Sequence, residues 1–163
     1  MDRDPEPTQE ALEEQADAVA DFVEELLERM GIDAIAEPTS HGDHIYVDIM
    51  DGPEEDMGLL IGRQGQTLDA IQELARTAVG RQLNERIHVL VDVEDYRKRQ
   101  EDRLIQRARE VAERVEQTGQ EESLDPMNPY QRKLVHDVVA EFAGLESVSE
   151  GVEPERFVVI RPA

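Results

Sequence analysis

The sequence contains no cysteine and no tryptophan in 163 residues, and aromatic residues make up only 4% of it. Without cysteine, the chain can form neither a disulfide framework nor a thiolate metal site. It also has no apolar run close to the about 20 residues that span a bilayer. Its acidic first seven residues lack the apolar centre of a signal peptide. These absences predict a cytoplasmic protein that does not insert into a membrane.

Features that would support catalysis are scarce as well. The four histidines, His41, His44, His88 and His136, are scattered without the spacing of metal ligands. No serine lies in a G-x-S-x-G elbow. The carboxylates of residues 51–56 could hold a divalent ion, but they lack the spacing of a calcium loop, and a solvated loop is the simpler interpretation. We therefore expect no catalytic residue, no metal and no cofactor.

Acidic residues are abundant but unevenly distributed. The formal net charge is −22, to which residues 1–57 contribute −17, residues 58–118 contribute 0 and residues 119–163 contribute −5. Proteins that bind nucleic acid usually carry a basic surface. The balanced middle of the chain can still provide a local binding site, although non-specific affinity should then be weak and sensitive to salt.

A glycine-containing loop at residues 58–67, GLLIGRQGQT, is the most informative stretch. Gly62 and Gly65 lack a Cβ atom and can adopt backbone angles that other residues resist, so a bulky partner can approach the main chain. Thr67 is expected to cap the helix that begins at Leu68. The free N–H groups of that helix would favour an anion beside the loop.

Two interpretations of this loop remain open. It can be a tight helix–turn–helix linker that binds nothing, or it can hold a sugar–phosphate backbone. It is neither a P-loop nor a dinucleotide fingerprint, because Gly65 is not followed by Lys-Ser/Thr and the spacing is not G-x-G-x-x-G. The run I-G-R-Q-G resembles the I-G-x-x-G loop of KH domains, which clamps single-stranded RNA.

The elements expected around the loop follow the type II KH order and cover about residues 9–95. Residues 1–8 are expected to be disordered because they are rich in proline and acid. Apolar spacing predicts helices at residues 9–30 and 68–83, a short helical turn at 58–61, and strands at 32–36, 44–50 and 87–93, with a turn at 38–42. The helices should cover one face of a three-stranded sheet.

A second constellation lies at residues 128–136, NPYQRKLVH. Asn128 is a good N-cap and Pro129 fits the first helical position. Arg132 and His136 are four residues apart and share one edge of the helix. A surface histidine without a ligand would be the ordinary interpretation. Alternatively, the arginine can fork onto a phosphate and the imidazole can add a hydrogen bond or stack on a base.

The context of this helix favours the binding interpretation. A long charged helix is predicted at residues 95–117, where arginines at 99, 103 and 107 are usually solvated or paired but could contact phosphate. A turn before Arg156 and two strands at residues 145–149 and 156–160 follow the second helix. The pattern resembles the R3H domain, a small binder of single-stranded nucleic acid, over about residues 98–163. We expect a linking helix at 96–119 and the R3H domain proper at 120–163.

A KH domain followed at once by an R3H domain resembles the Jag/KhpB family of bacterial RNA-binding proteins. The resemblance implies RNA chaperoning or post-transcriptional regulation, with links to cell elongation, cell-wall synthesis, a small KH-only partner and a membrane-protein insertase. Many members carry an additional N-terminal Jag domain. This sequence begins almost directly at the KH domain, so the role of the Jag domain is not expected here.

We therefore expect a two-domain α+β protein that binds single-stranded RNA without catalysis, with single-stranded DNA as an alternative ligand of the R3H domain. The expected contacts are Gly58, Leu60, Ile61, Gly62, Arg63, Gln64 and Gly65 in the KH loop and groove, and Arg132, His136 and Arg156 in the R3H domain. A protein–protein adaptor that docks a partner through the acidic helix at residues 9–30 is the alternative.

Overall fold

The computed structural model describes residues 6–41 and 44–163 of the chain. It divides into two compact units, Met1–Tyr96 and Arg97–Ala163, each with its own core. The mixed α and β architecture agrees with the expected fold class. Most of the segment predicted to be disordered, and Gly42 of the predicted turn, lie outside the described residues.

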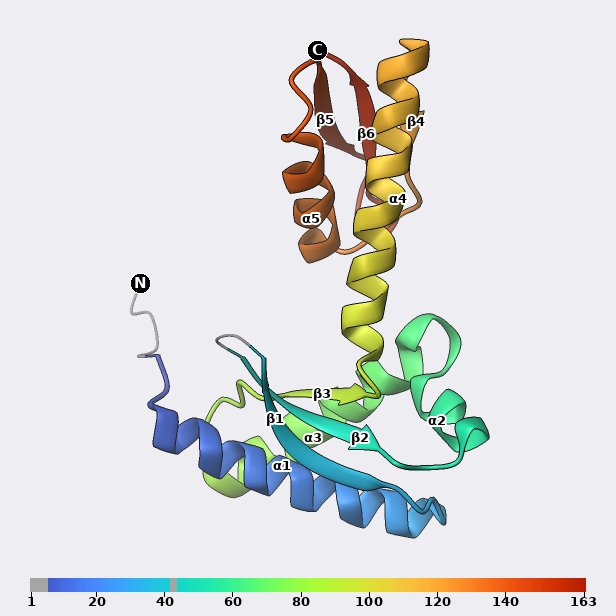
Figure 1. The fold of residues 1–163 in the computed structure, drawn as a ribbon. Coiled ribbons are helices and arrows are strands. Elements are labelled where there is room, and N and C mark those ends of the chain that lie inside the picture. The colour runs from blue at the N-terminus through green and yellow to red at the C-terminus, as the bar shows by residue number, and fades with distance from the viewer. Residues whose placement is uncertain (1–5, 42–43) are drawn as a thin grey trace. The chain divides into compact units, whose positions relative to one another are not determined.

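The first unit has the element order expected for a type II KH domain (Figure 1). Its sheet has the strand order β1-β2-β3, with β1 and β2 antiparallel and β2 and β3 parallel. The elements are α1 (Gln9–Met30), β1 (Ile35–His41), β2 (His44–Met50), α2 (Glu54–Ile61), the 3-10 turn η1 (Arg63–Gly65), α3 (Gln66–Leu83) and β3 (Leu90–Val93).

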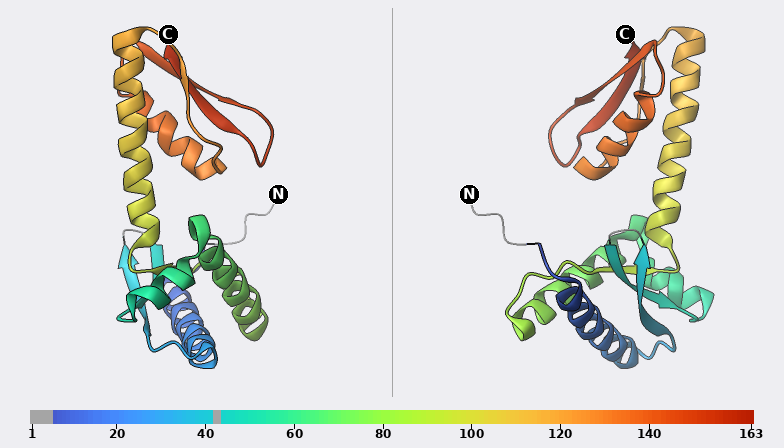
Figure 2. Two further views of the ribbon diagram at one scale, coloured as in Figure 1. Left: turned by 90° about the vertical axis from the view of Figure 1, so that its right-hand side faces the viewer. Right: turned by 60° about the vertical axis from the view of Figure 1, so that its left-hand side comes forward.

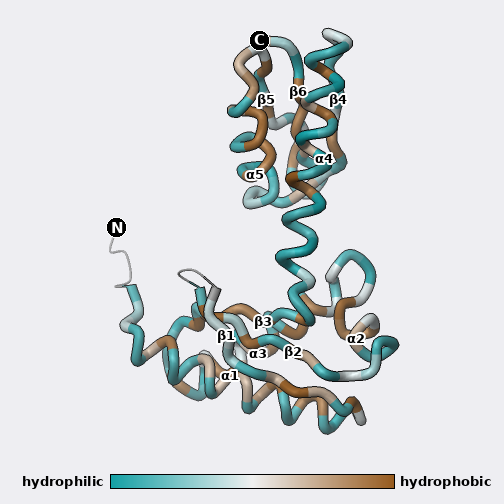
Figure 3. Tube along the Cα trace, in the orientation of Figure 1, coloured by the Kyte–Doolittle hydropathy of each residue, from teal (hydrophilic) through white to brown (hydrophobic). Residues whose placement is uncertain are grey.

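Helix α1 begins and ends where the sequence predicts. The Thr8 hydroxyl accepts a hydrogen bond from the Ala11 N–H at 3.2 Å, and Gly31 ends the helix in the left-handed region at φ 73°. Hydrophobic residues recur along the helix between hydrophilic ones (Figure 3), and those facing the sheet are buried. Helices α1 and α3 lie side by side (Figure 2). The core lies between them and the sheet.

Several boundaries differ from the sequence prediction, including the start of β1 at Ile35 rather than at residue 32 and the start of α3 at Gln66 rather than at Leu68. Strand β1 continues to His41 through Pro38, where a turn was predicted. A proline has no N–H to donate, but β1 is an edge strand and tolerates that loss. Strand β3 begins at Leu90 rather than at residue 87. Helix α2 begins inside the predicted loop, because Glu54, Glu55 and Asp56 suit the positive end of a helix.

The second unit combines two helices with a three-stranded antiparallel sheet of order β4-β6-β5. Helix α4 was predicted to link two domains, but its second half supplies four buried residues to the core of this unit. It is therefore part of the second unit rather than a free linker. The elements are α4 (Tyr96–Thr118), β4 (Glu122–Ser123), α5 (Pro129–Val139), β5 (Leu145–Glu150) and β6 (Phe157–Pro162). Within the described parts of both units, no helix is long and apolar enough to cross a membrane.

Gln15 holds helix α1 to the segment that enters β3. Its side chain is 2% exposed and donates to the Arg86 carbonyl at 3.1 Å and to the Glu85 carboxylate at 3.2 Å. Its carbonyl oxygen accepts from the His88 N–H at 2.9 Å. Three backbone and side-chain groups of one loop thus depend on a single amide.

We predict that Gln15→Leu lowers the free energy of unfolding by about 1–2 kcal/mol, because it leaves the partly buried backbone carbonyl of Arg86 and N–H of His88 without their partner. Urea denaturation measures the effect. The exposed Gln9 bonds only to Glu13, so Gln9→Ala serves as the control and should cost less than about 0.5 kcal/mol. Equal losses in the two variants would contradict the role assigned to Gln15.

Candidate nucleic-acid interface

The loop between α2 and α3 is a tight turn built from left-handed backbone. The Gly62 N–H donates to the Gly58 carbonyl at 3.0 Å and ends α2. Gly62, Gln64 and Gly65 have φ values of 71°, 55° and 77°. Three of four consecutive residues thus lie in a region that favours glycine. The chain reverses here and enters α3 directly at Gln66.

Both glycines of the turn are required by close packing. A Cβ atom on Gly62 would overlap the Thr67 hydroxyl and lie 2.7 Å from the Thr67 Cβ. A Cβ atom on Gly65 would lie 2.9 Å from the Tyr96 ring. Real Cβ atoms do not make such contacts, so neither glycine can be replaced without movement of a neighbour. The turn therefore has one fixed shape.

The structure corrects the role predicted for Thr67. Gly65, not Thr67, is the N-cap of α3, and no side chain caps this end of the helix. Thr67 lies in the first turn, against Gly62. A side-chain cap would satisfy one of the free N–H groups at a helix start. Without it, these groups and the helix dipole remain available to an anion.

The outer side of the turn carries two polar side chains that have no hydrogen-bond or ion-pair partner among the described residues. Arg63 and Gln64 are exposed, and their side chains make no hydrogen bond or ion pair with any described residue. Gly58 is exposed on α2, and a Cβ atom added there would meet nothing within 4 Å. These residues and half-buried Ile61 are here called the loop surface: Gly58, Ile61, Gly62, Arg63 and Gln64.

Two leucines beside the loop differ from the sequence interpretation. Leu60, expected to line a groove for bases, is fully buried, so its side chain anchors α2 from beneath and offers no surface to a base. Its neighbour Leu59 was not singled out, yet it is 60% exposed. Which leucine of this apolar run is buried and which is exposed depends on which face of α2 is turned toward the core. Helical periodicity over four residues is too short to settle that rotation.

Arg132, predicted to fork onto a phosphate, is held inside the second unit. Its side chain is 9% exposed, and its guanidinium donates to the Met127 carbonyl at 2.8 Å and to the Glu153 carboxylate at 2.6 Å. The Met127 N–H in turn donates to the carbonyl of Arg156 at 3.0 Å. The backbone of Met127 thus bonds both to the side chain of Arg132 and to the backbone of Arg156, and the Nε of Arg156 is buried without a partner among the described residues.

His136 also uses its side chain internally. Its Nδ1 lies 2.6 Å from the Ser147 hydroxyl and its Nε2 lies 2.8 Å from the Ser149 hydroxyl. The imidazole therefore joins α5 to β5. Burial lowers the pKa of His136, the charge of Arg132 lowers it further, and Asp137 opposes both. Direct contact of nucleic acid with Arg132 or His136 stays a prediction, and it would require each side chain to exchange an internal partner.

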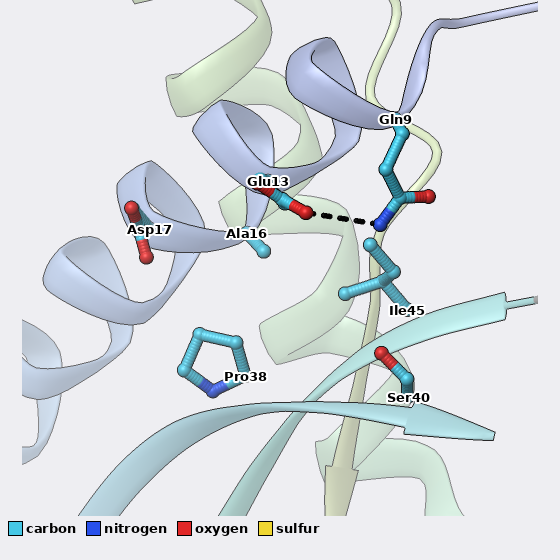
Figure 4. A pocket seen from close by; sticks show the side chains of 7 residues that line it. All are labelled: Gln9, Glu13, Ala16, Asp17, Pro38, Ser40 and Ile45. Carbon is cyan, nitrogen blue, oxygen red and sulfur yellow. Dashed lines mark hydrogen bonds between the residues drawn. The ribbon is translucent and has the colours of Figure 1, made fainter.

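A shallow hollow lies elsewhere in the first unit, between the start of α1 and the β1–β2 hairpin (Figure 4). One hydrogen bond, from Gln9 to Glu13 at 3.1 Å, crosses its rim. None of the predicted site residues lines this hollow. Among the residues that the structure describes, no cluster of three histidines or carboxylates could hold a metal ion.

Comparison with known proteins identifies both units. The model of the KhpA/KhpB KH domain family matches residues 16–91, and the R3H domain model matches residues 102–162. The chain belongs to the KhpB family. The KhpB resemblance therefore extends over both units in the expected order, and the two matched ranges include the loop surface and all three predicted residues of the second unit.

Several curated proteins of the KhpB family are similar to this chain. Each is named RNA-binding protein KhpB. The protein of Clostridium symbiosum is 34% identical over 146 residues, which are 88% of this chain and 64% of that protein. That of Lactiplantibacillus plantarum is 39% identical over 103 residues, 63% and 32% of the two chains, and that of Bacillus subtilis is 35% identical over 108 residues, 65% and 52%. The chain thus spans between about a third and two thirds of the length of these relatives.

The internal bonds of His136 predict a pH dependence of stability. The pKa of His136 in the folded protein lies below the ordinary value of 6.5, so the folded protein takes up a proton on this side chain less readily than the unfolded chain does. The unfolded state then binds more protons, so stability is full above pH 6.5 and falls as the pH drops below it. His136→Gln should cost about 1–2 kcal/mol at pH 8 and less at pH 5.

Chemical denaturation at several pH values measures this dependence. His88 is exposed, so His88→Gln is the control and should follow the wild-type curve. A constant difference between wild type and His136→Gln across the pH range would contradict the lowered pKa.

Proposed function

We propose that this chain is a non-catalytic protein that binds single-stranded RNA through the loop surface. The observation that carries the proposal is the combination of a rigid left-handed turn with an exposed, unpaired Arg63 at the uncapped start of α3. The chain contains many carboxylates that could form an ion pair with an arginine, yet Arg63 pairs with none of those in the described residues. Its availability is therefore consistent with an anionic ligand.

The geometry indicates how the strand would lie. Half-buried Gly62 has no side chain that could block a phosphate, and the exposed Arg63 and Gln64 can reach phosphate or sugar. Gly65, predicted as a contact as well, is buried against Tyr96 and shapes the turn from within. Gly58 leaves open space on α2 beside half-buried Ile61, where bases can be received. A KH domain reads about four nucleotides. Because aromatic residues are few, stacking should be sparse and sequence preference modest.

The second unit would add affinity through its tether to the first. Arg132, His136 and Arg156 remain proposed contacts there, subject to the exchange of internal partners, with single-stranded DNA as an alternative ligand. At the level of the cell, the family resemblance supports a cytoplasmic RNA chaperone or post-transcriptional regulator. Links to cell elongation, to cell-wall synthesis and to a small KH-only partner belong to the same proposal.

A second candidate function is that of an adaptor. Helix α1 exposes eight acidic side chains and one arginine on its outer face, so it could dock a basic partner.

Replacing four of these acids with lysine should abolish capture of such a partner in a pull-down while RNA binding persists. Unchanged recovery of the partner would remove the adaptor from consideration. The exposed acids on α1 are Glu10, Glu13, Glu14, Asp17, Asp21, Glu24, Glu25 and Glu28.

We predict that the double variant Arg63→Asp with Gln64→Asp loses RNA affinity by at least about tenfold, because two carboxylates then face the phosphates. Fluorescence anisotropy with a short single-stranded RNA measures the loss. Both positions are exposed, so the melting temperature should stay close to that of the wild type. Retained RNA affinity would exclude the loop as the binding site.

A subtler variant separates binding from folding at the same site. Gly58→Ala adds a methyl group in open space within a helix, so it should stabilise the protein by about 0.5–1 kcal/mol. RNA affinity should nevertheless fall severalfold, because the methyl group fills space reserved for the ligand. Gly144→Ala is the control, since it also adds a methyl group that meets nothing within 4 Å. Equal RNA affinity in both variants would show that Gly58 borders no binding groove.

A further inference from the structure

The first turns of α4 carry three cations that have no internal partner. Lys98, Arg99 and Arg103 are exposed and make no hydrogen bond or ion pair with any described residue. We call these three residues the α4 basic face. Among the residues that the structure describes, eight other basic side chains are paired with acids, namely Arg29, Arg76, Arg107, Arg109, Arg114, Arg132, Lys133 and Arg161.

Residues 97–103 of α4 contribute no hydrophobic side chain to either core, although Tyr96 before them and Leu104 and Ile105 after them pack partly buried against the cores. The buried residues of the helix are Ala108, Val111, Ala112 and Val115, all in its second half. Residues 97–103 are all charged or polar, and the tube is teal along this stretch of α4 (Figure 3). At about 100° per residue, Arg99 and Arg103 lie on the side of the helix opposite to these buried residues. They are one turn apart, about 6 Å along the axis, which is similar to the separation of neighbouring phosphates in an extended single strand.

The α4 basic face also works against the stability of its own helix. No acidic residue stands in the first turn, so cations lie at the positive end of the helix dipole. Arg99 and Arg103 repel each other as like charges four residues apart. Asp102 lies in the same stretch, yet no ion pair joins it to these cations. A group of like charges that opposes the stability of its own helix is typical of a functional site.

We propose that the α4 basic face binds the phosphates of single-stranded RNA. The proposal rests on the function proposed above and adds a contact that lies entirely on one helix of the second unit. Guanidinium groups suit phosphate geometry, and the dipole that opposes the arginines attracts the same phosphates. The contact carries no base readout, so it should strengthen binding to all sequences alike. It also gives the second unit a cationic surface that needs no exchange of the internal bonds of Arg132.

The test is a pair of glutamine variants of the full chain. Arg99→Gln with Arg103→Gln should weaken binding of a 12-nucleotide uridine strand by about tenfold at 0.1 M salt. The slope of log affinity against log salt should become shallower by about 1.4, since two phosphate contacts are lost at about 0.7 each. DNA of the same length should show the same change in slope. The melting temperature should stay equal or rise, because a repulsion has been removed.

The control is Arg81→Gln with Arg86→Gln, which removes the same charge from two exposed arginines without an ion pair among the described residues, one in the last turn of α3 and one in the segment that follows the helix. If Arg99→Gln with Arg103→Gln weakens RNA binding no more than this control does, the proposal is overturned. That result is also the one expected if the α4 basic face binds an acidic protein instead of RNA. Loss of binding in the Arg63/Gln64 variant alone would overturn only this inference. Loss in the Arg99/Arg103 variant alone would overturn the loop site and leave the α4 contact.

Discussion

The close approach of α2 to the start of α3 depends on two missing Cβ atoms. Thr67 occupies the space beside Gly62, and the Tyr96 ring occupies the space beside Gly65. On either side of the turn, Leu60 and Leu68 are fully buried. The two helices are thereby fixed to the core at their adjoining ends, and the backbone between them has no freedom to fold inward. Arg63 and Gln64 are directed outward as a consequence, which places the polar contacts of the loop surface where a ligand can reach them.

Charge is organised around this loop rather than averaged over the protein. The acidic residues concentrate before Gly58, and many of them line the outer face of α1. Such a surface repels polyanions that approach from other directions and lowers non-specific affinity. In the function proposed here, the unpaired cations at the loop surface and on the first turns of α4 would be the places that hold a phosphate backbone. For such a protein, repulsion by the acidic surface would restrict nucleic acid to the few cationic places, and the affinity would depend strongly on salt.

The second unit shows the difference between a motif and an available site. The spacing of Arg132 and His136 correctly places both on one edge of α5, and the matched R3H domain model includes both residues. The tertiary structure then supplies each with partners from distant parts of the chain: Glu153 for the arginine, and Ser147 and Ser149 for the histidine. A buried guanidinium requires such partners, because an unpaired charge away from water is strongly unfavourable. These partners lie on β5 and in the turn between β5 and β6, so the bonds that they form with Arg132 and His136 could not be deduced from the sequence of α5 alone.

The sequence by itself determined the bounds of α1, the β2 strand, the glycine turn and the order of the two domains, because local spacing and glycine positions encode these features directly. Only the tertiary structure decided that Pro38 lies within an edge strand, that Leu60 is buried while Leu59 is exposed, and that α4 packs into the second core. Each of these depends on which face of an element meets another element. That choice is made by contacts between residues far apart in the chain, and a local pattern does not contain it.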